Sequence, residues 1–506
     1  MFLTRREVLK TALAGAAPVR SSALSSSRPN ILFLMADQFR ADCIGADGNP
    51  AIHTPNLDRI AREGAQFRCA YSSMPTCTPA RSALLTGLAP WNHGMLRMIR
   101  MADHYPVVKP KSLREAGYYT MAIGKMHYHP QRHSHGFHNM VLDESSRAET
   151  PEYRSDYRSW FYSEAPGADP DVTGIGFNDY TARPYALPER LHPTAWMGNT
   201  AVNFLSRYDR AEPFFAKVSF ARPHSPYDPP ERLWRSYADA DLPAARAGTW
   251  AGKYRPRSWE RDDIWHGDMG AQQVRRARQG YYGSVTFVDE QIGRILEALE
   301  RRGRLEQTLI IFTSDHGDMT GDHHLWRKSY PYQASARIPF LVRWPSGLIS
   351  APRGQVRSET VELRDVLPTF LDAAGQPARE QFDGRSLLPL IAGKTGWRES
   401  LDLEHGVCYS KENHWNALTD GKWKYIFNAF DGSEQLFHLA EDPSELSDLA
   451  ASAPHTAELR GWRDRMVTHL APRGEAYVRG GRLLTRPDEP ATSPNFPGCK
   501  CHPQKS

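Results

Sequence analysis

Short apolar runs alternate with amphipathic helical patterns along most of this chain. Residues 31–35, 214–220, 309–313 and 338–344 are apolar runs of strand length. Apolar residues recur at three- and four-residue spacing from Val285 to Leu299, which predicts a helix that ends near Gly303, and residues 57–61 predict a shorter helix that stops at Gly64. Strands that are apolar on both faces are typical of a parallel sheet covered by helices. The pattern predicts an α/β fold with a large, mostly parallel sheet flanked by helices.

Polar residues follow several of these runs at their carboxyl ends. Asp37-Gln38 follows the first run, and Asp315-His316 follows residues 309–313. Open α/β sheets bind ligands at this edge, so we expect these side chains to converge. Two carboxylates and an imidazole suit a divalent cation such as calcium, although each acid taken singly would also fit a helix cap or a turn.

The C-terminal part of the chain has a different pattern. Asp420-Gly421 lies between residues 415–419 and 422–427, a two-residue hairpin signal with alternating aromatic residues. Residues 435–439 add a predicted edge strand, and residues 442–445 (D-P-S-E) are predicted to start a helix. We therefore expect a smaller antiparallel subdomain.

Four segments follow from these patterns. Residues 28–393 are expected to form the large α/β domain and residues 394–486 the α+β subdomain, with a signal at residues 1–27 and a poorly ordered tail rich in Pro, Ser and Lys at 487–506.

Composition excludes some classes of function. The 506 residues carry a formal charge of +5, with Lys and Arg scattered along the chain, so nothing indicates a nucleic-acid partner. The small positive charge would suit an anionic substrate. Six cysteines are too few and too irregular for a disulfide framework, and for Cys499 and Cys501 a disulfide, a weak metal site and no role all stay open.

The first residues resemble a bacterial twin-arginine export signal. Residues 4–10 read T-R-R-E-V-L-K and precede a mildly apolar stretch that is interrupted at Arg20. We expect export to the periplasm or the medium, and a cytoplasmic location if the signal does not function. No run approaches the roughly 20 apolar residues that span a bilayer, so no transmembrane segment is expected.

Residues 77–87 read C-T-P-A-R-S-A-L-L-T-G and combine a cysteine, a proline and an arginine at the start of a predicted helix. A thiol there lies near unpaired N–H groups and the positive end of the helix dipole, a place suited to negative charge. A single cysteine is usually a small buried apolar residue, but the complete pattern resembles the sulfatase signature.

Residues 117–127 read G-Y-Y-T-M-A-I-G-K-M-H and resemble the second sulfatase signature. A helix end capped by Gly117 is followed by a short predicted strand that delivers Lys125 and His127 to the carboxyl edge. The two matches identify the chain as similar to formylglycine-dependent sulfatases of the alkaline-phosphatase-like superfamily, closest in type to bacterial arylsulfatases and polysaccharide sulfatases.

The resemblance implies a covalent mechanism. Cys77 would be converted to formylglycine by a maturation enzyme, and its hydrated aldehyde would attack sulfur. Arg81 and Lys125 would hold that group and its developing charge, and His127 would act as the general base that regenerates the aldehyde.

The resemblance also implies substrate contacts. His224 would contact the sulfate or protonate the leaving alcohol, with help from Lys328. Spacing does not say whether Arg327 or Lys328 points inward, and His324 is a further candidate contact that would equally fit a solvated loop histidine.

The implied cation, most simply Ca²⁺ with Mg²⁺ or Mn²⁺ as alternatives, would be held by Asp37, Gln38, Cys77, Asp315 and His316. Gln38 replaces the usual second carboxylate of the family with a neutral carbonyl.

Two long segments, 144–193 and 250–269, are rich in aromatic residues, Arg, Pro or Gly, and read as surface insertions. They suit either a sulfated sugar or a packed covering layer. Three functions stay open: a sulfate ester hydrolase acting on a sulfated carbohydrate or aryl sulfate, a phosphonate monoester or phosphodiester hydrolase of the same superfamily, and a non-catalytic binder of sulfated glycans.

Overall fold

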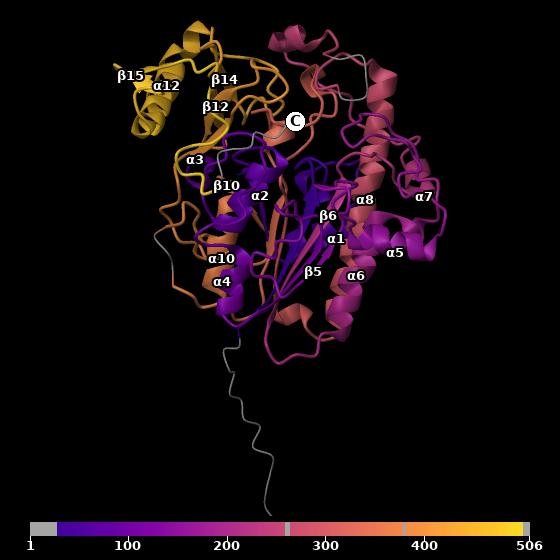
Figure 1. Ribbon diagram of the computed structural model, residues 1–506. Helices are drawn as coiled ribbons and strands as arrows, with labels where there is room; N and C mark the ends of the chain where they lie inside the picture. Colours follow the sequence, from indigo (N-terminus) through magenta and orange to yellow (C-terminus); the bar gives the residue numbers. More distant parts are fainter. Residues whose placement is uncertain (1–27, 259–263, 378–380, 499–506) are drawn as a thin grey trace, which may run out of the picture.

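A large, mostly parallel sheet forms the centre of the molecule (Figure 1). The computed structural model describes residues 28–258, 264–377 and 381–498, so the predicted signal at 1–27, Cys499 and Cys501 lie outside the described residues. Within them, eight strands pair in the order β5-β4-β6-β1-β7-β8-β2-β9, with β8 antiparallel to its neighbours. Their bounds are β1 Asn30–Asp37, β2 Ala65–Phe67, β4 Tyr119–Gly124, β5 Asn139–Leu142, β6 Phe214–Pro223, β7 Thr308–Ser314, β8 Phe340–Arg343 and β9 Gln355–Arg357.

Helices cover both faces of this sheet because its central strands are apolar on both sides. In β1, Leu32 and Leu34 face one core, while Ile31 and Phe33 face the other. The first core includes residues of α1 Pro55–Arg62, α5 Asp156–Glu164, α6 Pro193–Arg207 and α8 Ala271–Arg301. The second includes residues of α2 Cys77–Thr86, α4 Lys109–Glu115, α10 Val366–Ala373 and α11 Leu387–Ile391. The predicted fold class is confirmed.

In the large domain, the predicted elements agree with the structure except in their limits. The helix expected from Val285 begins earlier, since α8 starts at Ala271 and buries Tyr281 as well as the predicted stripe. Short elements complete this part of the chain: β3 Ala70–Tyr71, which pairs with β10 Val361–Glu362, and the helices α3 Pro90–His93, α7 Glu231–Ser236 and α9 Gln333–Ala336.

The C-terminal sheet is antiparallel, with the order β11-β12-β13-β14 and the predicted hairpin at Asp420-Gly421. One of its faces packs on α12, and the other packs on residues 319–336 of the large domain. The strands are β11 Leu401–His405, β12 Trp415–Thr419, β13 Trp423–Asn428 and β14 Glu434–His438, followed by α12 Thr456–Leu470 and the short pair β15 Val478–Arg479 and β16 Arg482–Leu483.

The prediction of a helix starting at residues 442–445 is wrong, because α12 begins at Thr456. Glu445 has a φ of 57° and is buried, where its carboxylate accepts hydrogen bonds from Lys424 and from the backbone N–H of Gln333. Of the tail predicted at 487–506, residues 499–506 lie outside the described residues, while within 487–498 Ser493 donates to the Trp91 carbonyl and Phe496 is buried in the second core. Tertiary contacts thus decide the conformation of both segments.

Within residues 28–258, 264–377 and 381–498, none of the helices has both the length and the apolar character needed to cross a bilayer.

Candidate active site

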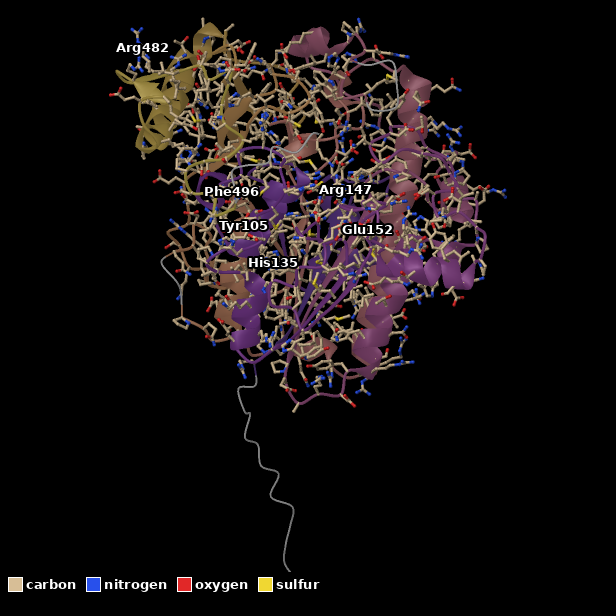
Figure 2. The ribbon with its side chains drawn as sticks, in the orientation of Figure 1. Tyr105, His135, Arg147, Glu152, Arg482 and Phe496 are labelled. Atoms are coloured by element: carbon tan, nitrogen blue, oxygen red, sulfur yellow. The ribbon has the colours of Figure 1, made fainter. Side chains whose placement is uncertain are left out.

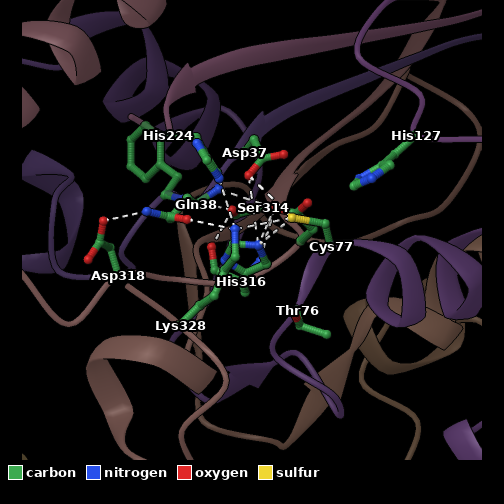
Figure 3. A network of polar contacts seen from close by, with 12 residues as sticks. Asp37, Gln38, Thr76, Cys77, His127, His224, Ser314, His316, Asp318 and Lys328 are labelled. Atoms are coloured by element: carbon green, nitrogen blue, oxygen red, sulfur yellow. Dashed lines mark hydrogen bonds and ion pairs between the residues drawn. The ribbon is translucent and has the colours of Figure 1, made fainter. Parts of the chain in front are cut away.

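Four neighbouring parallel strands end at one edge of the sheet and deliver polar residues there. In the order β4, β6, β1 and β7, the chain continues into Lys125, His224, Gln38 and Asp315. The edge therefore brings together side chains that lie far apart in sequence, as open α/β sheets do at their ligand sites (Figure 3).

Cys77 is the first residue of α2 and is fully buried at this edge. Its Sγ lies 3.3 Å from Lys328 Nζ, 3.2 Å from His316 Nε2 and 4.0 Å from Asp37 Oδ1. Burial and Asp37 would raise the pKa of the thiol, but the positive groups, Lys328 foremost, lower it to about 6. The position therefore favours a negatively charged or strongly polarised group.

Two buried carboxylates lie beside Cys77 and are held by two buried cations. Arg81 donates through Nη2 to Asp37 Oδ2 at 3.0 Å and through Nε to Asp315 Oδ2 at 2.9 Å, and Lys125 Nζ lies 2.6 Å from Asp37 Oδ2. Burial would raise the pKa of Asp37, but Lys125 and Arg81 hold it well below its usual range. Arg81 therefore orients both carboxylates through its two ion pairs. Its guanidinium also donates a hydrogen bond to the Lys125 carbonyl.

The donor set fits a divalent cation. Ligand atoms of Asp37, Cys77, Asp315 and His316 all lie within 4.8 Å of one another. His316 Nδ1 is 2.9 Å from the Gly317 carbonyl, which makes it the protonated nitrogen and leaves the Nε2 lone pair directed to the cluster. Burial would lower the pKa of His316, but its neighbours, Asp315 foremost, raise it.

Gln38 lies beside this cluster with its amide orientation fixed. Its Nε2 donates to Asp318 Oδ2 at 2.6 Å, and its Oε1 accepts from Lys328 Nζ at 3.0 Å. Asp318 also accepts from Tyr227 Oη on the same oxygen. The carboxylate thus selects the amide orientation that presents Oε1, the atom a hard cation would require.

Lys328 points inward, which answers the question that spacing left open. Its Nζ lies 2.9 Å from His224 Nε2, and His224 Nδ1 lies 2.9 Å from the Ser225 carbonyl. The guanidinium of Arg327 instead lies 4.7 Å from the Tyr409 ring centroid. Burial lowers the pKa of Lys328, which makes its ammonium a better proton donor.

His127 stands apart from the Cys77 cluster in Figure 3. Its backbone N–H and that of Met126 donate to the buried Glu144 carboxylate, and Arg147 donates to its ring. Gly124 has a φ of 91°, and a Cβ there would lie 2.3 Å from the Ser219 carbonyl oxygen, so this turn requires glycine. Burial, with Arg147 and Lys125, holds the pKa of His127 well below its usual range, so the ring is neutral.

Among the described residues, no hydrogen bond joins His324 to the cluster. Its Nδ1 lies 3.9 Å from Asp268 Oδ2 in the second insertion.

Sequence reasoning missed Asp318, Glu144 and Arg147, and also Phe177, whose ring centroid lies 5.0 Å from Lys125 Nζ and 4.3 Å from that of the His224 ring. Asp318 follows the Asp315-His316 pair at the same strand end. The expectation that polar residues converge at this edge could therefore have included it. The other three lie in the insertion 144–193, where no periodicity or spacing points to a site.

Two family profiles and several known proteins match this chain. The profile of the family described as Sulfatase matches residues 29–376, and that described as N-sulphoglucosamine sulphohydrolase, C-terminal, matches residues 321–469. An arylsulfatase of Clostridium perfringens is 39% identical over 472 residues, covering 90% of this chain and 97% of its own.

Two further relatives differ in the activity that their names state. An N-acetylglucosamine-6-O-sulfatase of Bacteroides thetaiotaomicron is 27% identical over 501 residues, covering 85% of this chain and 84% of its own. The crystal structure of a phosphonate monoester hydrolase of Agrobacterium radiobacter superposes with a TM-score of 0.73 at 27% identity, covering 91% of this chain and 100% of that one.

Proposed function

Since the chain belongs to the sulfatase family and is a sulfuric ester hydrolase, we propose that it cleaves sulfate esters through a formylglycine made from Cys77, assisted by a divalent cation. The position of Cys77 supports this most directly. Its sulfur stands where the diol oxygens of the hydrated aldehyde would be, within 3.3 Å of Lys328 Nζ and 3.2 Å of His316 Nε2. A nucleophile and its charge-stabilising groups therefore share one buried site.

The proposed ligands of the cation are Asp37, Gln38, Asp315 and His316, together with the modified Cys77. Oxygen donors dominate this set, which favours Ca²⁺ over softer metals, with Mg²⁺ or Mn²⁺ as alternatives. When bound, the cation would supply Lewis-acid stabilisation of charge on sulfate oxygens. Arg81 would keep the two carboxylates in place through its contacts with both.

The proposed reaction has two steps. One diol hydroxyl attacks sulfur, the ester S–O bond breaks, and the proton that the hydroxyl loses passes to the leaving alcohol through the Lys328–His224 pair, whose nitrogens are 2.9 Å apart. Then neutral His127 removes the proton of the other hydroxyl, the C–O bond to sulfate breaks, and the aldehyde forms again. Each step moves one proton to or from a residue at this edge.

The proposed substrates are sulfated carbohydrates or aryl sulfates. The names of the Bacteroides and Clostridium relatives support these two classes. We further propose that a formylglycine-generating enzyme matures Cys77 and that residues 1–27 direct export to the periplasm or the medium. Twin-arginine export carries folded protein, which would allow maturation before export.

A phosphonate monoester or phosphodiester hydrolase is the second candidate. The Agrobacterium structure supports it, together with the Asp-Gln and Asp-His pairs of this chain. The intact segment that ends in Lys125 and His127 favours the sulfatase.

The mass of the tryptic peptide that carries Cys77 tests the proposal first. Protein made with a formylglycine-generating enzyme should show conversion of the thiol to the aldehyde, and protein made without it should not. Matured enzyme should then hydrolyse 4-nitrophenyl sulfate, and Cys77→Ala, purified identically, should lose nearly all of that turnover.

Two other outcomes would contradict the proposal. An unmodified thiol despite the maturation enzyme would favour a glycan binder without catalysis. Faster hydrolysis of bis(4-nitrophenyl) phosphate than of the aryl sulfate would favour the diester hydrolase.

A further inference from the structure

Arg147, labelled in Figure 2, is a half-buried cation in contact with His127, the proposed base. It lies in the insertion 144–193, directly after a turn in which its N–H donates to the Glu144 carbonyl. Its guanidinium donates to the His127 ring and lies over the Phe177 ring, 4.6 Å from the centroid. The insertion therefore directs one charged group towards the proposed base.

Arg147 has no acidic partner within the described residues, and only its Nη1 makes a hydrogen bond there. The neighbouring carboxylates are engaged elsewhere. Glu144 accepts from the backbone of residues 126 and 127, and Glu149 accepts from His129 and Gln131. A half-buried guanidinium that retains free N–H donors is suited to bind an anion from outside the chain.

Arg158 and Arg132 of this region are paired, whereas Arg154 and Arg183 form no ion pair within the described residues but are exposed, so Arg147 differs from both groups. Arg158 forms an ion pair with Asp171, and Arg132 donates to both oxygens of Asp156 at 3.1 Å. The cations beside Cys77 are also matched, because Arg81 contacts both Asp37 and Asp315. Arg147 therefore adds positive charge that no nearby carboxylate offsets.

Phe177 connects Arg147 to the proposed catalytic residues. Its ring centroid lies 5.0 Å from Lys125 Nζ and 4.3 Å from the centroid of the His224 ring. Since His224 contacts Lys328 and Lys328 contacts Cys77, Arg147 stands one aromatic ring away from the groups proposed to hold the scissile sulfate. That separation suits a second group on the same or the adjacent sugar.

We propose that Arg147 is a specificity-determining residue that binds a second anionic group of the substrate, a carboxylate or a further sulfate, next to the sulfate that is cleaved. This inference rests on the proposed function, because it names the class of ester that the site prefers. The guanidinium would form a bidentate contact with the anion. Its N–H donors form a planar fork, and a carboxylate or a sulfate presents paired acceptor oxygens.

The same contact would prepare His127. In the structure Arg147 donates to the imidazole, which occupies a nitrogen that the proposed base needs. An anionic group that draws the guanidinium to itself leaves the ring free to accept a proton. A doubly anionic ester would thus gain both affinity and a competent base.

The test compares two aryl esters that differ by one charge, 4-nitrophenyl sulfate and 3-carboxy-4-nitrophenyl sulfate, on matured enzyme. The measured quantity is the ratio of kcat/KM for the dianion to that for the monoanion. Arg147→Ala should lower this ratio about 10-fold or more, mainly through KM for the dianion, and Arg147→Lys should restore part of it. Arg158→Ala, which removes a paired arginine of the same region, should leave the ratio unchanged.

A second pair identifies the source of the anion: N-acetylglucosamine 6-O-sulfate and glucosamine 2-N,6-O-disulfate. A ratio that depends on Arg147 with the sugars but not with the aryl esters assigns the residue to a second sulfate, and the reverse assigns it to a carboxylate. Equal losses for all esters in Arg147→Ala would overturn the proposal, because Arg147 would then act on the cleaved sulfate or on His127 alone. Absence of turnover with every ester would instead refute the proposed function and the premise with it.

Discussion

Replacing Asp318 by Asn should reverse the orientation of the Gln38 amide. In the wild type, Asp318 Oδ2 accepts from Gln38 Nε2 at 2.6 Å and from Tyr227 Oη. In the wild type, the backbone N–H of Thr320 donates to Asp318 Oδ1 at 2.9 Å, and the carbonyl oxygen of Asn can keep this bond. The NH₂ group of Asn would then face two donors, Gln38 Nε2 and Tyr227 Oη.

The size of the effect follows from these contacts. Each hydrogen bond to the charged carboxylate is worth about 1.5–3 kcal/mol, so the original amide orientation loses its main support. After a flip, Gln38 regains a bond to the substituted side chain but turns its NH₂ towards Lys328 Nζ, which in the wild type lies 3.0 Å from Oε1. A proposed cation ligand would thereby be lost, and we expect Asp318→Asn to weaken Ca²⁺ binding by about 10- to 100-fold.

Calorimetric titration of Ca²⁺ into wild type and Asp318→Asn at one pH measures this difference, and thermal unfolding without metal checks that the variant folds. Adding Gln38→Glu to Asp318→Asn should restore binding, because the Glu carboxylate accepts from the introduced amide while its other oxygen faces the cation and Lys328. Gln38→Glu alone should bind poorly, since it sets two carboxylates against each other. An affinity of Asp318→Asn within twofold of the wild type would refute the reasoning.

Three further changes are expected to act at single sites. Asp289 of α8 accepts from the backbone N–H of Leu57 at 2.8 Å and so caps α1, and Asp289→Ala should lower the free energy of unfolding by about 2 kcal/mol in urea titrations; an unchanged midpoint would contradict the capping role. For Glu489, burial would raise the pKa, but its hydrogen-bonded and charged neighbours lower it from 4.5 to about 2, so its ionised form stabilises the fold above pH 4.5 and that stability is lost as the pH falls towards 2. Glu489→Gln should therefore cost about 3 kcal/mol at pH 6, and the difference from wild type should shrink on acidification; a constant difference would exclude this linkage. Glu144→Ala removes the acceptor of the His127 N–H, whose nitrogen lies 3.1 Å from Glu144 Oε1, and should lower kcat on an aryl sulfate about 10-fold or more. An unchanged kcat would show that Glu144 does not position the proposed base.

Local patterns were sufficient for most of the architecture. Strands such as residues 31–35 and helices such as residues 57–61 were visible because burial on both faces, or on one helical stripe, leaves a periodic trace in neighbouring residues. The prediction at residues 442–445 was wrong for the complementary reason. A helix-start signal is local, while Glu445 is committed to Lys424 through a buried ion pair at 2.8 Å.

The amino-acid sequence by itself indicated the sheet, its helical cover, and the placement of Asp37, Lys125 and Asp315 at strand ends on one edge, because each of these depends on residues close in the chain. Only the tertiary structure decided that Lys328 rather than Arg327 points inward and that Arg81 joins the two carboxylates. It also decided the partners of Gln38 and the approach of Arg147 to His127. These contacts join separate loops and strands, and Gln38 and Lys328 are 290 residues apart in the sequence. A periodic pattern reflects only neighbouring residues and cannot indicate such a contact. Packing and charge compensation establish it only when the whole chain has folded.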